Sequence, residues 1–219
     1  MSRPRPTLRR EAALWRAGRV VVAGLDEAGR GPLACPVVAA AVVFPAYCEP
    51  IPDLDDSKCL SPATRARLAT VVRERAVVAL GAASVREIDR LNIRRASILA
   101  MRRALFRLPV SPTHVLVDGL PCPELGCPHE AIIDGDARCQ SIAAASVLAK
   151  TVRDLLMERL STRYPVYAWA SNKGYATPAH LDALSAHGPT AHHRRSFGPV
   201  AQLWLLASAA AVAPPAAGD

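Results

Sequence analysis

The stretch Val20 to Phe44, VVVAGLDEAGRGPLACPVVAAAVVF, constrains the fold more than any other part of the chain. An apolar run ends abruptly in two carboxylates, Asp26 and Glu27, and a second valine-rich run begins at Val37. Short apolar runs bounded by turn residues are typical of buried strands. We therefore predict a β-hairpin connected by Gly29 to Pro36. Because neighbouring side chains on a strand point to opposite faces, the two acids can share a site only where the strand bends or ends.

The balance of charge indicates an anionic partner. The chain of 219 residues has 27 Lys and Arg against 19 Asp and Glu, a formal net charge of +8. A basic protein of this size suits nucleic acid, although an arginine-rich proteome would give the same excess. Between Arg65 and Arg107, eleven arginines stand against three acids. Such a run is either a solvated helix face or a track for a phosphate backbone, and the size of its excess favours the track.

We expect a soluble, cytoplasmic protein. No apolar run follows the basic residues 1–10 before Val20, and the apolar stretches 33–47 and 200–212 are too short to span a membrane. The six cysteines are predicted to be free thiols. Cys122, Cys127 and His129 form the only cluster that suggests zinc, but a second ligand pair is missing, so we do not expect a zinc site.

The order of apolar runs predicts an α/β protein with a mixed sheet that starts from the antiparallel hairpin. Further strands are expected at 76–83, 113–117 and 131–133, and helices after Ser61 to about residue 75, from Ser84 to about 108, from Ser141 to about 160, at 178–186 and from about 199 to 212. No internal repeat is present.

Three of the predicted strand ends carry carboxylates, namely Asp26 with Glu27, Asp118, and Asp134 with Asp136. If these ends converge, the resulting cluster contains oxygen ligands without imidazole or thiolate. Hard divalent ions such as Mg²⁺ prefer this set. An acidic cluster inside a basic protein favours metal-dependent cleavage of a phosphodiester.

Several segments together resemble bacterial ribonuclease HII. They are DEAGRG at 26–31, DSKCL at 56–60, IDRLNIRRAS at 88–97, VLVDG at 115–119, GDARCQSIAAASVLAKTVRD at 135–154, NKGYATPAH at 172–180 and HRRSF at 193–197. The resemblance covers about residues 20–200. It implies a ribonuclease H-like mixed five-stranded sheet flanked by helices, with a small helical C-terminal region.

The implied organisation is a basic flexible arm at 1–18, a ribonuclease H-like catalytic core at 19–163, a C-terminal helical region with a substrate-contacting loop at 164–212, and a disordered tail at 213–219. The implied activity is hydrolysis of the RNA strand of RNA–DNA hybrids and cutting on the 5′ side of single ribonucleotides in duplex DNA. The products would carry 5′-phosphate and 3′-hydroxyl ends, as primer removal and ribonucleotide excision repair require. The expected cofactor is Mn²⁺ or Mg²⁺, and we expect a monomer without an obligate protein partner.

The resemblance also assigns roles to individual residues. The family's catalytic, metal-binding acids match four carboxylates: Asp26, Glu27, Asp118 and Asp136. Its substrate-binding residues match a second set: Gly29, Arg30 and Gly31, which approach the ribose 2′-hydroxyl, and Tyr175, which stacks beneath the following sugar. Lys58 and Ser146 either touch substrate phosphate or bond locally, and the sequence leaves both roles open.

Five further residues near these motifs are not assigned to the site. Asp154 follows Lys150 by four residues, which favours a structural ion pair over a ligand role. His192 and His193 are interpreted as surface histidines in a basic loop. Cys35 stands where the family usually has glycine, and Asp134 where a lysine is common, so local loop geometry is uncertain at both positions.

Two other functions compete with the nuclease. A nucleic-acid-binding module that had lost its chemistry would not be expected to keep all four acids. A junction resolvase or transposase of the same fold would lack the GRG element and the tyrosine. We therefore predict a metal-dependent endonuclease.

Overall fold

The computed structural model describes residues 5–212, with side-chain burial described up to residue 205. Five strands form one sheet: β1 (Val22–Ala28), β2 (Val37–Val43), β3 (Val77–Ala83), β4 (His114–Asp118) and β5 (His129–Ile132). The helices are α1 (Arg9–Arg16), α2 (Pro62–Arg75), α3 (Val85–Leu91), α4 (Ile93–Phe106), α5 (Gln140–Arg163), α6 (Trp169–Asn172), α7 (Pro178–His187) and α8 (Gly198–Val212). Short 3₁₀ turns are η1 (Pro123–Leu125), η2 (Gly135–Ala137) and η3 (Pro165–Tyr167).

The sheet is mixed, with strand order β3-β2-β1-β4-β5. β1 pairs antiparallel with β2 and parallel with β4, and β4 pairs parallel with β5. The predicted hairpin and the mixed five-stranded sheet are therefore confirmed. Because β1 and β4 are parallel neighbours, their carboxyl ends meet at one edge of the sheet, where both strands end in acids.

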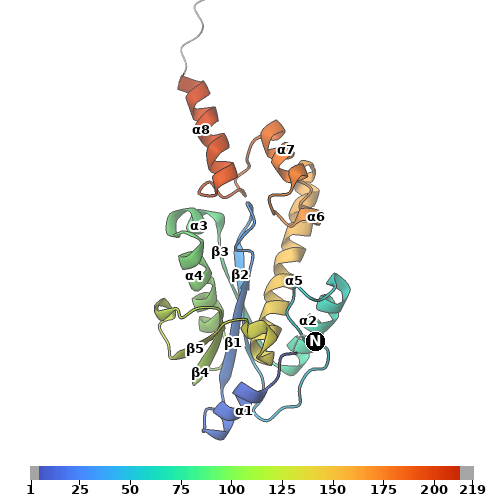
Figure 1. Cartoon of the computed structure of the whole chain (residues 1–219), viewed down its shortest axis with the longest axis vertical. Helices are drawn as coiled ribbons and strands as arrows, with labels where there is room; N and C mark the ends of the chain where they lie inside the picture. The colour runs from blue at the N-terminus through green and yellow to red at the C-terminus, as the bar shows by residue number, and fades with distance from the viewer. Residues whose placement is uncertain (1–4, 213–219) are drawn as a thin grey trace, which may run out of the picture.

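The sheet lies between two helical layers, with α4 on one face and α5 on the other (Figure 1). The α5 layer approaches β1 very closely because the facing positions carry small side chains. A Cβ added at Gly24 would lie 2.2 Å from the carbonyl carbon of Ser141 and 2.6 Å from the nitrogen of Ile142. The alanine-rich sequence of α5 and Gly24 thus set the distance between helix and sheet.

We expect Gly24→Ala to lower the free energy of unfolding by about 2 kcal/mol or more, because a backbone clash cannot be relieved by a side-chain rotation. Thermal unfolding measures this. Gly198→Ala is the matched control, since a Cβ there meets nothing within 4 Å. Equal melting temperatures for the two variants would mean that α5 can move away from the sheet freely.

Residues 9–16 do not belong to a flexible arm, in contrast to the sequence prediction for 1–18. They form α1, whose Trp15 packs into the core beside α5. The buried Glu11 carboxylate accepts hydrogen bonds from the main-chain nitrogen and the hydroxyl of Ser141, at 2.9 and 2.6 Å. A carboxylate at the start of a helix is favoured by the helix dipole and by the free N–H groups there. The basic composition of this segment concealed the buried side of α1.

The predicted helix beginning at Ser84 is interrupted. The capping box of Ser84 and Glu87 starts α3 as expected, but Asn92 has φ of 69° and ends it. The Asn92 side chain then accepts a hydrogen bond from the nitrogen of Arg95 and caps α4. The apolar spacing continues across the break, which is why the sequence shows one segment where the structure has two helices.

The C-terminal region shares a hydrophobic core with the hairpin connection. Leu33, Ala34 and Cys35 of the connection pack with Trp169 and Leu184. Figure 1 shows α7 and α8 at the end of the sheet where this connection lies. The C-terminal helices therefore support the loop that follows the paired acids.

Within residues 5–212, no helix has the length and apolar character to cross a membrane. The predicted disordered tail, 213–219, lies outside the described residues.

Candidate active site

Two neighbouring parallel strands bring the first acids together. Leu25 of β1 lies opposite Val117 of β4, so Asp26 and Asp118 each follow one residue later at the same edge. Asp26 is buried, and its Oδ1 accepts a hydrogen bond from the nitrogen of Glu27 at 2.7 Å. Asp118 is held by the nitrogen of Gly135, which donates to its Oδ1 at 2.8 Å.

Asp136 reaches the same edge from η2, the turn that follows β5. A Cβ added at Gly135 would lie 2.7 Å from Cδ1 of Ile142 and 3.3 Å from Oδ1 of Asp118, so glycine favours the close approach of this turn to the β4 end. Asp136 also lies beside Asp56, and the Nζ of Lys58 lies 3.7 Å from Oδ2 of Asp136. Asp56, Lys58 and Asp136 thus form one side of the acidic site.

The acids destabilise one another's charged forms. Burial, followed by the charges of Glu27 and Asp118, raises the pKa of Asp26 well above its usual range. Burial and the neighbouring Asp56 raise the pKa of Asp136 to about 6. Burial raises the pKa values of Glu27 and Asp118 as well, although Arg30 partly offsets the shift at Glu27. A cation placed among these carboxylates would relieve both the desolvation and the repulsion.

Asp26 and Glu27 extend to opposite faces of β1. Glu27 shares its face with Leu25 in the core beneath α4, whereas Asp26 shares its face with Gly24 beneath α5. Among residues 5–212, no three His, Cys, Asp or Glu side chains form a group with the spacing of a metal-ligand set in this structure. The donor chemistry fits a hard divalent ion, and the four-acid ligand set stays a prediction.

The GRG loop, Gly29 to Gly31, lies directly beside this acidic edge. Arg30 Nη1 is 3.1 Å from Glu27 Oε1. A Cβ added at Gly31 would lie 3.4 Å from Cε1 of Tyr175, which places the tyrosine ring against the loop. The nitrogen of Leu33 donates to the carbonyl of Gly174 at 2.8 Å and ties the two loops together. The predicted recognition residues are thus brought together, and Tyr175 remains 47% exposed.

Comparisons with known proteins identify the family of this chain. The sequence model of the ribonuclease HII family matches residues 23–200. The chain belongs to the ribonuclease HII family. It is 52% identical to ribonuclease HII of Granulibacter bethesdensis over 97% of this chain and 96% of the relative. It is 54% identical to ribonuclease HII of Rhizorhabdus wittichii over 86% and 93% of the two chains.

Solved structures show the same fold at lower identity. Ribonuclease H2 from Pyrococcus horikoshii OT3 has a TM-score of 0.69 at 22% identity, covering 84% of this chain and 96% of that one. Bst-RNase HIII, solved in complex with Mn²⁺, has a TM-score of 0.65 at 19% identity, covering 90% and 73%. The ribonuclease H-like α/β fold is thereby confirmed. Membership of the family makes this chain an endoribonuclease that hydrolyses the RNA strand of RNA–DNA hybrids.

Lys58 and Ser146, whose roles the sequence left open, differ in accessibility. The Lys58 side chain is exposed beside Asp136, so it is free to reach a phosphate. Ser146 is buried, hydrogen bonds to Asp26, and its hydroxyl lies 2.9 Å from that of Ser57. This geometry favours local hydrogen bonding for Ser146 and leaves substrate contact as the prediction for Lys58.

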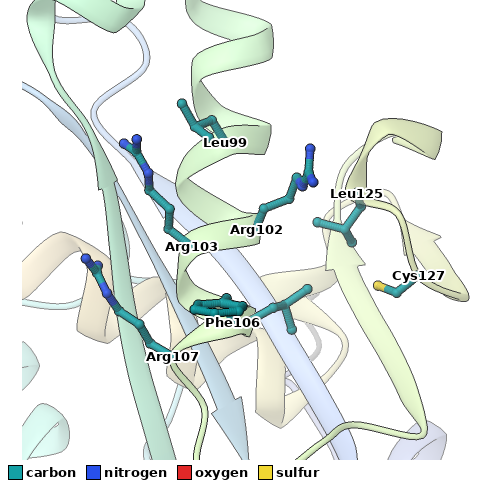
Figure 2. A pocket seen from close by; sticks show the side chains of 8 residues that line it. Leu99, Arg102, Arg103, Phe106, Arg107, Leu125 and Cys127 are labelled. Atoms are coloured by element: carbon teal, nitrogen blue, oxygen red, sulfur yellow. The ribbon is translucent and has the colours of Figure 1, made fainter.

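The site opens into a cleft of about 220 Å³ lined by Glu27, Arg30 and Asp118 together with Arg94 and Ser97 of α4. A larger hollow of about 680 Å³ lies elsewhere, between α4 and the loop around η1. Figure 2 shows Arg102, Arg103 and Phe106 of α4, and Arg107 directly after it, around this hollow, with Leu125 and Cys127 from the neighbouring loop. Its lining contains no carboxylate, so the smaller cleft is the candidate for hydrolysis.

The separate interpretation of Asp154 is confirmed. The Asp154 carboxylate accepts hydrogen bonds from Lys150 Nζ at 2.7 Å and from Arg65 at 3.2 Å, so it forms structural ion pairs with both residues.

The zinc alternative gains no support, because Cys122, Cys127 and His129 do not form a metal-holding group within the part of the chain described. Instead, the nitrogen of Cys122 donates to His129 Nε2 at 3.2 Å.

The prediction for His193 is wrong. Only 1% of His193 is exposed, because it packs among Tyr167, Trp169 and His180. Burial, with the nearby imidazoles, lowers its pKa to about 4. The nitrogen of Thr190 donates to His193 Nδ1, so His193 Nε2 carries the proton and donates to His180 at 3.1 Å. His180 Nδ1 in turn donates to the carbonyl of Tyr175 at 2.8 Å, which fixes the tyrosine loop.

Sequence reasoning missed Asp56 and Ser57 as neighbours of the site. Both lie in the DSKCL segment, which was considered only for Lys58. The carboxylate of Asp56 was available as a signal, but the loop carries three aspartates, Asp53, Asp55 and Asp56, and the sequence does not distinguish them. In the structure, Asp56 is the one that the loop buries against Asp136.

Proposed function

We propose that this ribonuclease HII family member is a divalent-metal-dependent endonuclease that also cuts on the 5′ side of a single ribonucleotide embedded in duplex DNA. The observation that carries the proposal is the adjacency of the acidic edge to the GRG loop and Tyr175. The acids and the loop are continuous in the chain: Asp26 and Glu27 lie in the last three residues of β1, and Gly29 to Gly31 follow directly after Ala28. Recognition of a sugar is therefore coupled directly to the position of the reacting phosphate.

The proposed ligands of Mn²⁺ or Mg²⁺ are Asp26, Glu27, Asp118 and Asp136. A bound ion would supply an activated water and stabilise the leaving oxygen. The protein's contribution is to hold the carboxylates in low-dielectric surroundings, where their raised pKa values favour a cation. We propose that Lys58 contacts a substrate phosphate, which its exposed position beside Asp136 supports. The expected products carry 5′-phosphate and 3′-hydroxyl ends, as primer removal and ribonucleotide excision repair require.

Discrimination between RNA and DNA rests on the 2′-hydroxyl. We propose that main-chain groups of Gly29, Arg30 and Gly31 approach this hydroxyl, while the Tyr175 ring lies beneath the next sugar. An aromatic ring there accepts deoxyribose, and an added hydroxyl would crowd it. The preferred substrate is therefore a junction from RNA to DNA.

A duplex with one ribonucleotide tests the proposed function directly. Incubation with Mg²⁺ or Mn²⁺ should give a nick 5′ of the ribonucleotide, and chelator should abolish it. A polymerase should extend the product, because a metal-activated water leaves a 3′-hydroxyl. Cleavage that persists with chelator would overturn the metal dependence. A break 3′ of the ribonucleotide that leaves a 2′,3′-cyclic phosphate would show the ribose hydroxyl to be the nucleophile and would also overturn the proposal.

Affinity for a hybrid should fall steeply between low and physiological salt, with log K linear in log salt. The physical reason is release of counterions by arginines of the 65–107 segment and of the loop containing His192 to Arg195. Arg65 and Arg194 should contribute nothing, because both side chains are buried, Arg65 against Asp154. Fluorescence anisotropy without metal measures the slope. An affinity that is flat across this range would make the basic face an ordinary solvated surface.

A further inference from the structure

Two arginines near the GRG loop are buried without a carboxylate partner. Arg153 is 1% exposed and Arg194 is 0% exposed, and neither forms an ion pair within residues 5–212. Arginine is seldom fully buried unless it is paired. Burial, followed by the charge of the neighbouring Arg153 guanidinium, lowers the pKa of Arg194 to about 9. Burying two unpaired cations costs free energy. The hydrogen bonds that the two arginines form therefore indicate which part of the structure they stabilise.

Arg194 binds both ends of the hairpin connection through carbonyl oxygens. Its Nη2 donates to Gly29 at 2.6 Å, its Nη1 donates to Arg30 at 2.9 Å, and its Nε and Nη2 donate to Cys35 at 2.9 and 2.7 Å. The rigid, planar guanidinium supplies donors in a fixed fork. It therefore fixes the orientation of two consecutive peptide planes of the GRG loop.

The orientation of these carbonyls determines where the amide groups point. In a planar trans peptide, the C=O of one residue and the N–H of the next point in opposite directions. Because the carbonyls of Gly29 and Arg30 point inward to Arg194, the N–H groups of Arg30 and Gly31 point outward. Neither N–H donates to a protein acceptor among the described residues, and both residues are exposed. The loop therefore presents two consecutive free donors beside the acidic edge.

We propose that Arg194 is a positioning residue for ribose recognition: it holds the Gly29 and Arg30 carbonyls inward so that the amides of Arg30 and Gly31 present their N–H groups to the 2′-hydroxyl. The inference rests on the proposed function, in which this loop reads the sugar. The buried cation on the carbonyl side also polarises the same peptide groups and strengthens them as donors. Arg194 lies beneath the loop and does not touch the substrate.

Arg153 supports the same loop from a second side. It donates to the carbonyls of Ala34, Pro36 and Lys173 at 3.1, 3.2 and 3.0 Å. A Cβ added at Gly29 would lie 2.0 Å from its Nε, so the first glycine of the loop leaves room for this guanidinium. Arg153 links the later part of the hairpin connection, Ala34 and Pro36, to the Tyr175 loop. Of the two arginines, only Arg194 donates to the Gly29 and Arg30 carbonyls, whose orientation makes the next two N–H groups point outward.

The test measures binding without metal to two duplexes, one with a single ribonucleotide and one of DNA only. Arg194→Lys keeps the charge but not the fork, and should lower the ratio of the two affinities by about tenfold, the worth of one well-placed hydrogen bond to a polar group. Both duplexes are titrated against the same preparation, so the ratio does not depend on the folded fraction. Arg194→Gln, neutral but with two amide donors, serves if the lysine variant does not fold.

Two controls separate positioning from general effects. Arg159→Lys changes an exposed arginine of α5 that lies outside the 65–107 segment and the His192 to Arg195 loop, and should leave the ratio unchanged. Val72→Ala, in the core beneath α2, lowers stability without touching the loop and should also keep the ratio. An unchanged ratio in the folded Arg194 variant would overturn the positioning role. A wild-type ratio of one would instead overturn the proposed recognition of single ribonucleotides.

Discussion

Asp118→Asn is expected to lower the rate of hybrid cleavage by about a thousandfold or more, since catalysis by a bound metal depends on each anionic ligand. The substitution is nearly isosteric, and the amide oxygen can still accept the hydrogen bond that Gly135 donates at 2.8 Å. The turn carrying Asp136 should therefore stay in place. Single-turnover cleavage of a labelled hybrid with Mg²⁺ or Mn²⁺ measures the loss.

Stability provides the internal control for this variant. Burial raises the pKa of Asp118, so its charged form is disfavoured in the folded protein, and its removal should leave the melting temperature unchanged or higher. Binding to a hybrid without metal should survive. Asp134→Asn is a matched control, because Asp134 stands at the same edge but outside the proposed ligand set. If Asp118→Asn retained more than a small fraction of the wild-type rate, its metal assignment would be wrong.

The acidic edge was predictable because strand ends can be located from apolar runs. Asp26 and Asp118 each end such a run, and parallel pairing of β1 with β4 then places them side by side. The relation of Asp26 to Glu27 was not predictable. Whether two consecutive acids share a face depends on where the strand stops, and β1 continues to Ala28, so the two side chains extend to opposite faces.

Buried polar contacts over long sequence separations were also beyond the sequence. Arg194 and His193 lie in a segment that looks basic and exposed, yet both are buried beneath the GRG and Tyr175 loops. Their partners are main-chain carbonyls and other imidazoles, which carry no signature in a sequence. Glu11 was concealed in the same way, since its partner Ser141 lies 130 residues further along.

Cys35 and Asp134, the two residues that differ from those usual in the family, share an unusual backbone conformation. Cys35 has φ of 71° and Asp134 has φ of 53°, which places both in the left-handed region. Glycine occupies this region without strain, which accounts for the family's preference at position 35. The Cys35 carbonyl accepts two hydrogen bonds from Arg194, so the strained residue forms part of the support beneath the GRG loop. Neither departure removes an acid from the site.

Tyr175→Ala is expected to reduce cleavage at a single ribonucleotide by about 5- to 100-fold, the range that corresponds to loss of an aromatic stacking contact with a nucleotide. Cleavage within a long hybrid should fall much less, because the ring is proposed to select the deoxyribose that follows the ribonucleotide. The comparison uses initial rates on both substrates with the same preparation. Tyr175→Phe keeps the ring without its hydroxyl and should retain the preference.

The competing explanation is that Tyr175 only covers the apolar base of the loop from Asn172 to Thr177. The structure argues against it, since Tyr175 is 47% exposed and its ring lies against Gly31. The loop is held by main-chain groups that alanine would keep: the Tyr175 nitrogen donates to Asn172 at 2.9 Å, and His180 donates to the Tyr175 carbonyl. The melting temperature of Tyr175→Ala should therefore change little. A proportional loss on both substrates with a lowered melting temperature would establish the structural role instead.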